Sequence, residues 1–435
     1  QDKNSKYSAK VGYRTVNYRS NLDINLTKST ALYFGADGFI STKSEPGNND
    51  TDALWATQRN LTPITIPTIY STGHLPAYGV DNAYSPYVML NKTGMTNIRH
   101  YRGKATLELK QDLSMLLKGL KIRAQGAYDT ETNLKEIRSI RPEMYYAQTR
   151  KYTGELGIIK RVESEPAKYT HEDEQFYKVH FETTATYETT VAKEHRLSAL
   201  LYYYMSSEQR MNKDIDAKAE TLRSMYAIPI RYQGLSGRIT YGFRDTYFMD
   251  VNFGYTGSEN FQSGHRFGFF PSVAVGWIPT QYEFMQRGLP WLNFLKIRAS
   301  YGTVGNDRLT DERFPYLTLM VDGDGGGWGS SSGYITEERV GANNLRWEKA
   351  KKADLGIEGR LFNEKLQFVV DFFQDKRDGI YQRRSQIPSY VGLTQMPFGN
   401  VGKMKSYGSD GNISFTQDFG KDMTLTLRGN FTYSA

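Results

Sequence analysis

Apolar and polar residues alternate along many short segments of the chain, most clearly in a hairpin within residues 343–378. Its arms, residues 354–361 and 366–372, flank a polar turn at residues 362–365. Successive side chains of an extended chain point to opposite faces, so strict alternation predicts β-strands with one apolar face. One face collects Leu355, Ile357, Leu361, Leu366, Phe368, Val370 and Phe372, and the other collects Asp354, Glu358, Arg360, Gln367 and Asp371.

The same alternation predicts twelve further strands, which makes fourteen in all. They cover residues 17–26, 31–39, 104–113, 121–128, 176–189, 195–205, 238–243, 247–255, 270–278, 295–302, 407–419 and 423–433. The connections between strands alternate between short and long. The longest are residues 41–99, 130–175, 206–235, 303–350 and 374–406. The connection at residues 279–294 has room for a helical turn.

Alternating short and long connections place all short turns on one rim of a sheet and all long loops on the other. An up-and-down meander has this property, whereas a Greek-key sandwich does not. Outer-membrane barrels combine short turns, long loops and spanning strands of about 9–11 residues. The pattern therefore predicts an all-β fold, an antiparallel up-and-down transmembrane β-barrel.

The number of strands indicates which face of the sheet contacts water. A soluble barrel of about eight strands fills its interior with side chains, but fourteen strands enclose a lumen too wide to fill. We therefore expect the apolar face to contact lipid and the polar face to line a water-filled lumen. Unpaired sheet edges are costly in lipid, so the strands either close on themselves or belong to a larger closed barrel.

The same assignment orients the hairpin described above. Residues 362–365 are expected to form a periplasmic turn, and Trp347 to mark the extracellular approach. A charge placed at Phe368 is expected to cost about 2–4 kcal/mol if that residue lies near the middle of the membrane.

Composition agrees with a barrel and excludes other classes. The 435 residues include 32 Tyr, 22 Phe and 40 Gly, and no Cys that could form disulfides or a thiolate metal site. No apolar run is long enough for a transmembrane helix. The net charge of +8 is scattered, so no nucleic-acid partner is expected. The first ten residues lack the apolar core of a signal peptide, and we expect both ends to be cuts within a longer gene product.

No arrangement of residues in the sequence indicates catalysis. The six His residues lack metal-binding spacing, and there is no nucleophile-elbow motif, so no catalytic residue, metal or cofactor is expected. The run 171–174 (HEDE) is interpreted as solvated charge in a polar loop. The loop 322–329 (DGDGGGWG) begins like a Ca²⁺-binding loop but lacks the bidentate Glu, so an extracellular loop is the preferred interpretation.

Aromatic and arginine residues in two long loops are the candidates for substrate binding. They are Trp328, Tyr334, Tyr381, Arg383 and Arg384. Aromatic faces stack on sugar rings or peptide side chains, and Arg binds carboxylates with two parallel hydrogen bonds. The alternative is that these residues pack the loops together or sit in the interfacial aromatic belt. The run 202–204 (YYY) is expected to belong to such a belt.

Four stretches of the chain resemble the SusC/RagA family of TonB-dependent outer-membrane transporters of Bacteroidetes-type bacteria. They are residues 270–277 (FPSVAVGW), 295–306 (LKIRASYGTVGN), 344–348 (NLRWE) and 400–403 (NVGK). Their order and spacing match the barrel half of that family, so the resemblance covers most of the chain. After the last stretch, residues 408–410 (GSD) replace the family's usual Gly-aromatic-Glu.

The resemblance implies a barrel of about 22 strands around a plug, with this chain supplying roughly strands three to sixteen. Residues 1–435 would then be a partial barrel domain that lacks the plug, the TonB box and the terminal strands. The implied partners are TonB, a SusD-like surface lipoprotein and the outer-membrane lipid or lipopolysaccharide. The implied cargo is an oligosaccharide or a peptide. Two other classes remain open: an outer-membrane barrel enzyme, such as a lipase or protease, and a plug-less passive pore or adhesin.

Overall fold

The computed structural model describes most of the chain. The described residues are 11–48, 50–61, 64–78, 83–149, 152–211, 225, 227–308, 313–323, 334–342, 344–384, 387–388, 396–420 and 422–435. No helix among them is long and apolar enough to cross a membrane.

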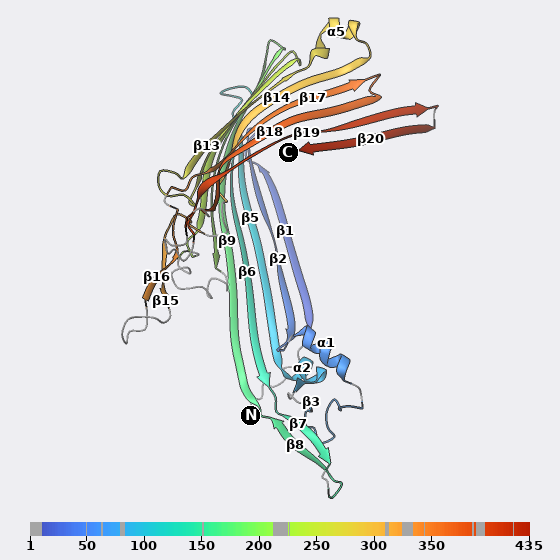
Figure 1. The fold of residues 1–435 in the computed structure, drawn as a ribbon, viewed down its shortest axis with the longest axis vertical. Helices are drawn as coiled ribbons and strands as arrows, with labels where there is room; N and C mark the ends of the chain where they lie inside the picture. Colours follow the sequence, from blue (N-terminus) through green and yellow to red (C-terminus); the bar gives the residue numbers. More distant parts are fainter. Residues whose placement is uncertain are drawn as a thin grey trace.

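The described residues form one large antiparallel sheet of fourteen strands, in which every strand pairs with the next member of the meander (Figure 1). Its strands are β1 Gly12–Asn25, β2 Thr30–Pro46, β5 Gly94–Asp112, β6 Leu120–Arg141, β9 Glu165–Val191, β10 His195–Met211, β11 Ile230–Phe243, β12 Tyr247–Ser258, β13 Phe267–Trp277, β14 Leu292–Asn306, β17 Glu348–Leu361, β18 Leu366–Arg383, β19 Phe398–Phe419 and β20 Met423–Ser434. The fourteen predicted strands and their meander order are therefore confirmed. The sheet is strongly twisted and open, with β1 and β20 at its edges.

Short turns and long loops alternate as predicted. The connection after β13 contains the predicted helical turn, as the 3₁₀ helix η1 Pro279–Gln281 and the helix α5 Glu283–Gly288. The long loops carry the small elements α1 Thr51–Asn60, β3 Ala77–Tyr78, β4 Ala83–Tyr84, α2 Pro86–Lys92, β7 Met144–Thr149, β8 Leu156–Val162, β15 Leu319–Gly323 and β16 Tyr334–Arg339. Figure 1 shows α1, α2, β3, β7 and β8 gathered into one lobe at the loop end of β2, β5, β6 and β9.

Two of the short turns show why such turns suit a twisted sheet. Ala192 and Lys193 have φ of 52° and 61°, and Arg244 and Asp245 have φ of 49° and 51°. Two consecutive residues with positive φ are the signature of a type I′ hairpin turn, whose twist matches that of the strands it joins. The polar turns therefore continue the right-handed twist without splaying the strands.

Several strands extend much further than predicted. β6 has 22 residues and β9 has 27, so the interval 130–175 is mostly strand and only its middle is a loop. β5 likewise begins at Gly94, and β2 continues to Pro46. The prediction ended these strands early because both faces are polar beyond the membrane, so the apolar alternation stops while the backbone pairing continues.

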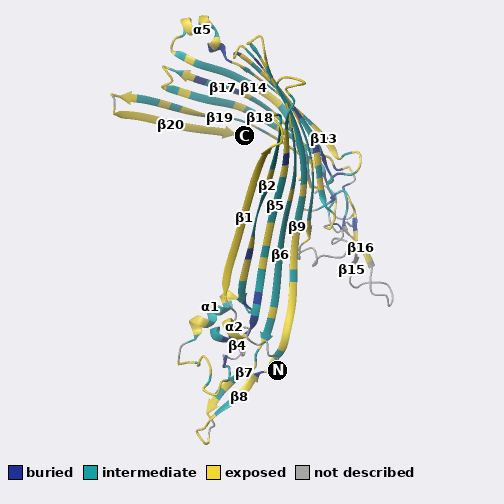
Figure 2. Ribbon diagram, turned by 180° about the vertical axis from the view of Figure 1, so that it is seen from behind, coloured by how far each residue is buried: buried dark blue, intermediate teal, exposed yellow. Residues whose placement is uncertain are grey.

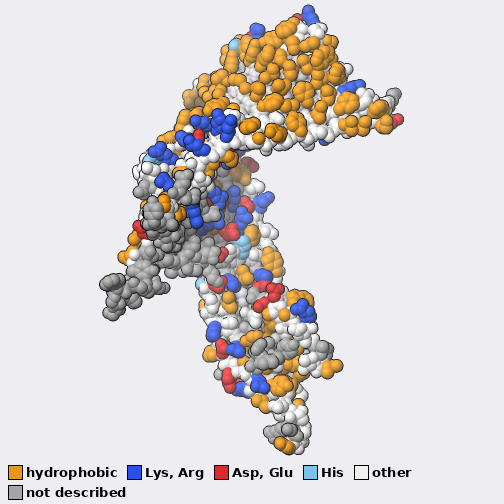
Figure 3. Space-filling model, in the orientation of Figure 1, with side chains coloured by type: hydrophobic (Ala, Val, Ile, Leu, Met, Phe, Trp, Pro, Cys, Tyr) orange, Lys and Arg blue, Asp and Glu red, His pale blue; other side chains and the backbone are white. Residues whose placement is uncertain are grey.

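Strand register confirms that the apolar residues of the hairpin share one face. Leu355 lies opposite Phe372 and Ile357 lies opposite Val370, while Gly356 lies opposite Asp371 on the other face. On this face Leu355 is 44% exposed and Phe372 is 50% exposed, while Ile357 and Val370 are half-buried. Hydrophobic side chains gather over β14 and β17–β20 in Figure 3, while buried residues are sparse along these strands in Figure 2. A face this large and apolar requires an apolar neighbour, and lipid supplies it.

Aromatic side chains mark both borders of the apolar face. At the short-turn end, the rings of Trp291 and Phe362 stack with centroids 6.0 Å apart. At the long-loop end, Tyr255 stacks on Phe267 at 5.0 Å. On β12 the border residues Tyr247 and Tyr255 are eight positions apart. That separation is about 26 Å along a strand, or about 20 Å along the normal of a tilted strand, close to the height of an outer-membrane apolar band.

The hairpin allows a direct test of the facing. Phe368 lies only two residues into β18, near the short-turn border, whereas Phe372 lies six residues in. We expect Phe372→Arg to lower the free energy of unfolding by about 2–4 kcal/mol, and Phe368→Arg to lower it less, because the penalty grows with depth. Urea unfolding of the full-length protein in lipid vesicles measures both.

Asn412→Arg is the matched control, because Asn412 is exposed on the polar face of β19, opposite Val369. We expect it to change stability by less than about 0.5 kcal/mol. Equal effects of arginine at positions 372 and 412 would contradict the facing.

Candidate functional site

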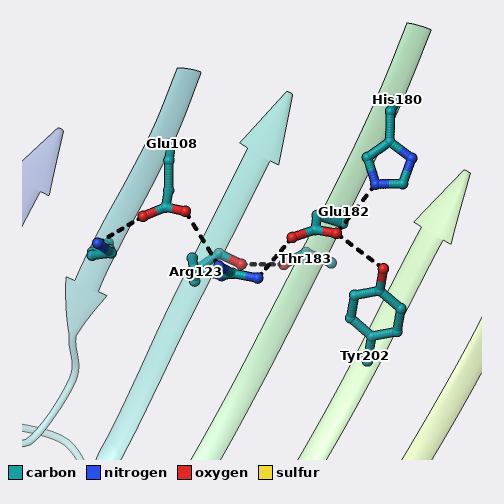
Figure 4. Close-up of polar contacts among 7 residues, drawn as sticks. Glu108, Arg123, His180, Glu182, Thr183 and Tyr202 are labelled. Atoms are coloured by element: carbon teal, nitrogen blue, oxygen red, sulfur yellow. Dashed lines mark hydrogen bonds and ion pairs between the residues drawn. The ribbon is translucent and has the colours of Figure 1, made fainter. Parts of the chain in front are cut away.

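The polar face of the sheet carries a chain of charged side chains that crosses neighbouring strands (Figure 4). Arg123 of β6 lies between two carboxylates: Nη1 is 3.3 Å from Glu108 Oε2 on β5, and Nη2 is 2.7 Å from Glu182 Oε1 on β9. Lys110 Nζ lies 2.7 Å from the other oxygen of Glu108. Glu108 is only 6% exposed, so its carboxylate depends on these two cations for charge compensation.

Two more side chains complete the hydrogen bonding of Glu182. Tyr202 Oη on β10 donates to Glu182 Oε2 at 3.0 Å, and His180 Nε2 lies 3.1 Å from the same oxygen. Charge-assisted hydrogen bonds of this kind are stronger than neutral ones. They connect β5, β6, β9 and β10 through side chains as well as through the backbone.

The prediction of an aromatic belt for residues 202–204 is wrong for two of the three tyrosines. The run lies inside β10, which continues to Met211. Tyr202 and Tyr204 lie on the polar face with ring centroids 5.7 Å apart, and only Tyr203 lies on the apolar face. The hydrogen bond from Tyr202 to Glu182 explains why a tyrosine suits the polar face here.

A second charged cluster lies on the same face at β14, β17 and β18. Arg298 Nε donates to Glu358 Oε1 at 3.1 Å, and Arg298 Nη2 donates to Asp371 Oδ2 at 2.8 Å. Asp354 Oδ1 lies 3.5 Å from Arg298 Nη1. Gly356 makes room for this cluster, because a Cβ there would lie 2.3 Å from the Asp371 carboxylate and 2.6 Å from Arg298 Nε. Asp354, Glu358 and Asp371, predicted to line the lumen, therefore share one arginine.

The two clusters were not recognised from the sequence. Each residue has the expected polar position within its own strand, but Arg123 and Arg298 are 15 to 73 positions from the carboxylates that they bind. Only the register between neighbouring strands brings these side chains together. In the described part of the chain, no three His, Cys, Asp or Glu residues come close enough to hold a metal ion. The clusters instead give the polar face a fixed pattern of charge.

Three of the five candidate substrate-binding residues lie together at the loop end of β18. The ring of Tyr381 stacks on Phe398 of β19 at 5.0 Å, and Arg383 Cζ lies 5.3 Å from the centre of the same ring. The Arg384 backbone N–H donates to Pro397 O at 2.9 Å. The side chains of Arg383 and Arg384 are exposed. Tyr381 is half-buried, so its ring both packs the loop and borders the surface.

The remaining two candidates are not brought into this group. Tyr334 begins β16, but its side chain lies outside the described residues, as does the whole of Trp328. The loop 322–329 is described only for Asp322 and Gly323, which end β15. Residues 171–174 lie in β9 and not in a loop, which corrects the prediction, and His171 Nε2 is 3.8 Å from Asp173.

A small apolar core supports the surface around Tyr381. Phe261, Ala342, Leu345 and Trp347 are buried together, with Tyr381 packed against them. Trp347 Nε1 donates to Arg266 O at 3.1 Å, which satisfies its only donor in the core. Trp347 precedes β17 at the long-loop end, where the extracellular approach was predicted.

Comparison with known proteins explains this arrangement. Residues 37–435 match the family model described as TonB dependent receptor-like, beta-barrel. The chain belongs to this family. TonB-dependent receptor P3 of Formosa agariphila is 25% identical over 229 residues, which are 51% of this chain and 22% of that protein. TonB-dependent receptor SusC of Bacteroides thetaiotaomicron is 27% identical over 201 residues, 46% of this chain and 20% of that protein.

A solved structure shows the same fold. The structure titled RagAB peptide importer in the 'closed-closed' state superimposes with a TM-score of 0.62 at 18% identity, over 97% of this chain and 46% of that chain. The chain therefore spans less than half the length of each of these relatives. As a TonB-dependent receptor barrel, it lies in the outer membrane, with its apolar face toward lipid.

The lobe at the loop end of this TonB-dependent receptor barrel has a core of its own. Val88 of α2, Met144 of β7, Ala77 and Val162 are buried together. On its surface Lys160 Nζ lies 3.1 Å from Glu143. Hydrogen bonds from Tyr145 and Lys160 lower the pKa of the Glu143 carboxyl. Parts of the intervals 41–99 and 130–175, both predicted to be long connections, therefore pack together into a lobe at the loop end of the sheet.

The Glu182 cluster yields a test with a built-in control. Tyr202→Phe removes the hydroxyl that bonds Glu182, and we expect a loss of about 1–2 kcal/mol in unfolding free energy, since the acceptor is charged and partly buried. Tyr204→Phe removes a hydroxyl from the same face, and we expect a change of less than about 0.5 kcal/mol. Equal losses in urea unfolding would show that the cluster contributes nothing.

Proposed function

We propose that the chain is the central part of the barrel of an active outer-membrane importer of bulky nutrients, either oligosaccharides or peptides. The observation that carries the proposal is the match to the TonB-dependent receptor barrel over residues 37–435. The continuous apolar face and the charged polar face support it, because they provide a lipid-embedded wall around a wet lumen. In this proposal the chain supplies roughly strands three to sixteen of a barrel of about 22 strands.

In the proposed mechanism the chain forms the wall of the barrel, and the moving parts are supplied by other segments and partners. The barrel wall surrounds a plug that the rest of the full-length protein supplies, and TonB, driven by the proton-motive force, displaces that plug. The charge clusters of Arg123 and Arg298 hold fixed charges on the wall, so a polar plug or solute meets a hydrated surface. A SusD-like surface lipoprotein would cover the mouth from the side of the long loops, where the lobe with Met144 and Val88 lies.

The residues at the loop end of β18 suit either class of cargo. Tyr381 presents a supported aromatic ring that can stack on a sugar or an apolar peptide side chain. Arg383 and Arg384 are exposed and can pair with a carboxylate, as in a peptide terminus or an acidic sugar. We include Trp328 and Tyr334 in the same proposed surface because they belong to the neighbouring long loop.

The rival classes have less support. A lipase or protease of the serine type needs a His hydrogen-bonded to a Ser, with a carboxylate that orients the His. Among the described residues, the hydrogen bonds of His side chains are with carboxylates, as in His100–Glu131, or with the hydroxyls of Tyr241 and Thr72, and none is with a Ser. A passive pore or adhesin would need no energy source, and that difference is measurable.

Uptake measurements in the source bacterium test the proposal. Deleting the full-length gene should abolish growth on, and accumulation of, one class of labelled oligosaccharide or peptide, and the intact gene should restore both. A protonophore or loss of TonB should stop accumulation against a gradient. Uptake that continues without the proton-motive force would favour the passive pore, and hydrolysis of lipid or peptide by the purified protein would favour the enzyme.

The proposed cargo surface has its own prediction. Replacing Arg383 and Arg384 together by Ala should raise the half-saturation concentration for uptake about three- to tenfold, since two exposed charge-assisted contacts are lost. The maximal rate should stay unchanged, because these residues would contribute binding and not transport.

Arg287→Ala is the matched control. Arg287 is an exposed arginine at the short-turn end, paired with Glu283 at 2.9 Å. Unaltered uptake kinetics in the double variant, at equal surface abundance, would remove Arg383 and Arg384 from the site.

A further inference from the structure

A buried arginine holds a turn in the long connection between β14 and β17. Arg339 of β16 is only 9% exposed. Its Nη2 donates to Arg313 O at 3.2 Å and to Phe314 O at 3.0 Å, and its Nε donates to Leu317 O at 3.4 Å. A guanidinium group presents five N–H donors in a planar fork, so one side chain can bind several carbonyls of a turn at once. Arg339 therefore fixes the turn at residues 313–317.

This turn contains a strained residue. Phe314 has a φ of 46°, in the left-handed region that bulky side chains rarely adopt. Such a conformation persists only where the surrounding contacts over-determine it. Here the ring of Phe314 is buried with Met225 and Leu319, the guanidinium of Arg313 lies 4.8 Å from its centre, and Arg339 binds its carbonyl. Contacts around the turn, and not local backbone preference, therefore set its position.

Arg313 extends from the turn to a second connection, the one between β10 and β11. Its Nη1 donates to Met225 O at 3.3 Å and to Ile228 O, and its Nη2 donates to Pro229 O at 3.3 Å. Ile228 and Pro229 directly precede β11. Arg339 thus holds the turn, and Arg313, projecting from that turn, holds the start of β11.

Tyr316 links the same turn to the core beneath Tyr381. Its side chain packs against two buried clusters, the one that contains Phe314 and the one that contains Trp347. Tyr381 packs against the second of these clusters. Gly341 lets the chain after β16 approach the turn, because a Cβ there would lie 2.4 Å from Tyr316 O. Close-packed side chains transmit displacement, so a shift of the turn would reach the ring of Tyr381.

We propose that Arg313 and Arg339, named the arginine hub, hold the β10–β11 and β14–β17 connections together as one unit and so set the position of Tyr381. The hub acts through the turn and Tyr316, so its arginines are positioning residues that need not touch the cargo. The role of Tyr381 in binding cargo rests on the proposed function. The joining of the two connections does not, because it follows from contacts within this chain.

Hydrogen exchange on the full-length protein tests the arginine hub. The protein is purified from outer membranes into mild detergent, and mass spectrometry follows exchange in each peptide. In Arg339→Gln we expect about tenfold faster exchange at the amides of Leu317 and Ala342, which are both hydrogen-bonded to carbonyls of the turn. Exchange should also rise at Arg384, whose amide is hydrogen-bonded at the loop end of β18.

Arg313→Gln separates the two steps of the hub. Exchange at the amide of Ile228, which donates to Met225 O at 3.3 Å, should rise about tenfold. The amide of Leu317 should stay protected, because Arg339 still holds the turn. Loss of protection at Leu317 to the same extent in both variants would contradict the order of the contacts.

Arg308→Gln is the matched control. Arg308 is an exposed arginine at the start of the same connection, and its backbone N–H donates to Asn306 Oδ1 at 3.1 Å. Exchange in this variant should equal that of the wild type. Wild-type exchange at the turn in Arg339→Gln would overturn the proposal, and so would faster exchange at the turn with no change at Arg384.

Uptake kinetics separate positioning from stability. At equal surface abundance, Arg339→Gln should raise the half-saturation concentration about three- to tenfold with the maximal rate unchanged, and Arg339→Lys should recover part of the loss. In a Tyr381→Ala background Arg339→Gln should add little, since both changes affect one contact. Full additivity would show that Arg339 does not act through Tyr381. Absence of uptake by the wild type would reject the import function, while hydrogen exchange would still decide whether the hub joins the connections.

Discussion

Backbone hydrogen bonding is the constraint on which this structure depends. In lipid no water is present to satisfy an N–H or C=O group, so a spanning strand must bond to neighbours along its length. The meander meets this requirement for the twelve inner strands, because each of them pairs with the sheet strand before it and the sheet strand after it, while β1 and β20 form the edges. Once the pairing is set, each strand offers one face to lipid and one to water, and the side-chain chemistry follows from that division.

Much of the fold could be predicted because this division leaves a periodic signal. Leu355, Ile357 and Phe372 alternate with charged residues, and that pattern located both the strands and their facing correctly. The signal exists only where lipid lies on one side. At Glu172 and Glu174 the strand has water on both sides, so β9 continues without any apolar period and the predicted strand begins too late.

The charge clusters could not be predicted because they depend on register between strands. Arg123 meets Glu108 and Glu182 only when β5, β6 and β9 are aligned to the residue, and a shift of one position would turn these side chains to the opposite face. The position of Tyr202 also depends on register. Its aromatic ring suggested a place at the border of the lipid, but its hydrogen bond to Glu182 requires the polar face. The position of Tyr381 depends on its packing against Trp347, and no local sequence pattern predicts that contact.

The length of β9 has a consequence for where the protein meets its surroundings. Its 27 residues extend about 90 Å along the strand, or about 65–70 Å along the normal at a tilt near 40°. The apolar band accounts for about 25 Å of this height. The rest of β9 lies beyond this band, and the lobe of α1, α2, β7 and β8 lies at its loop end (Figure 1). Under the proposed import function, this height would place the capture of cargo at a distance from the membrane surface.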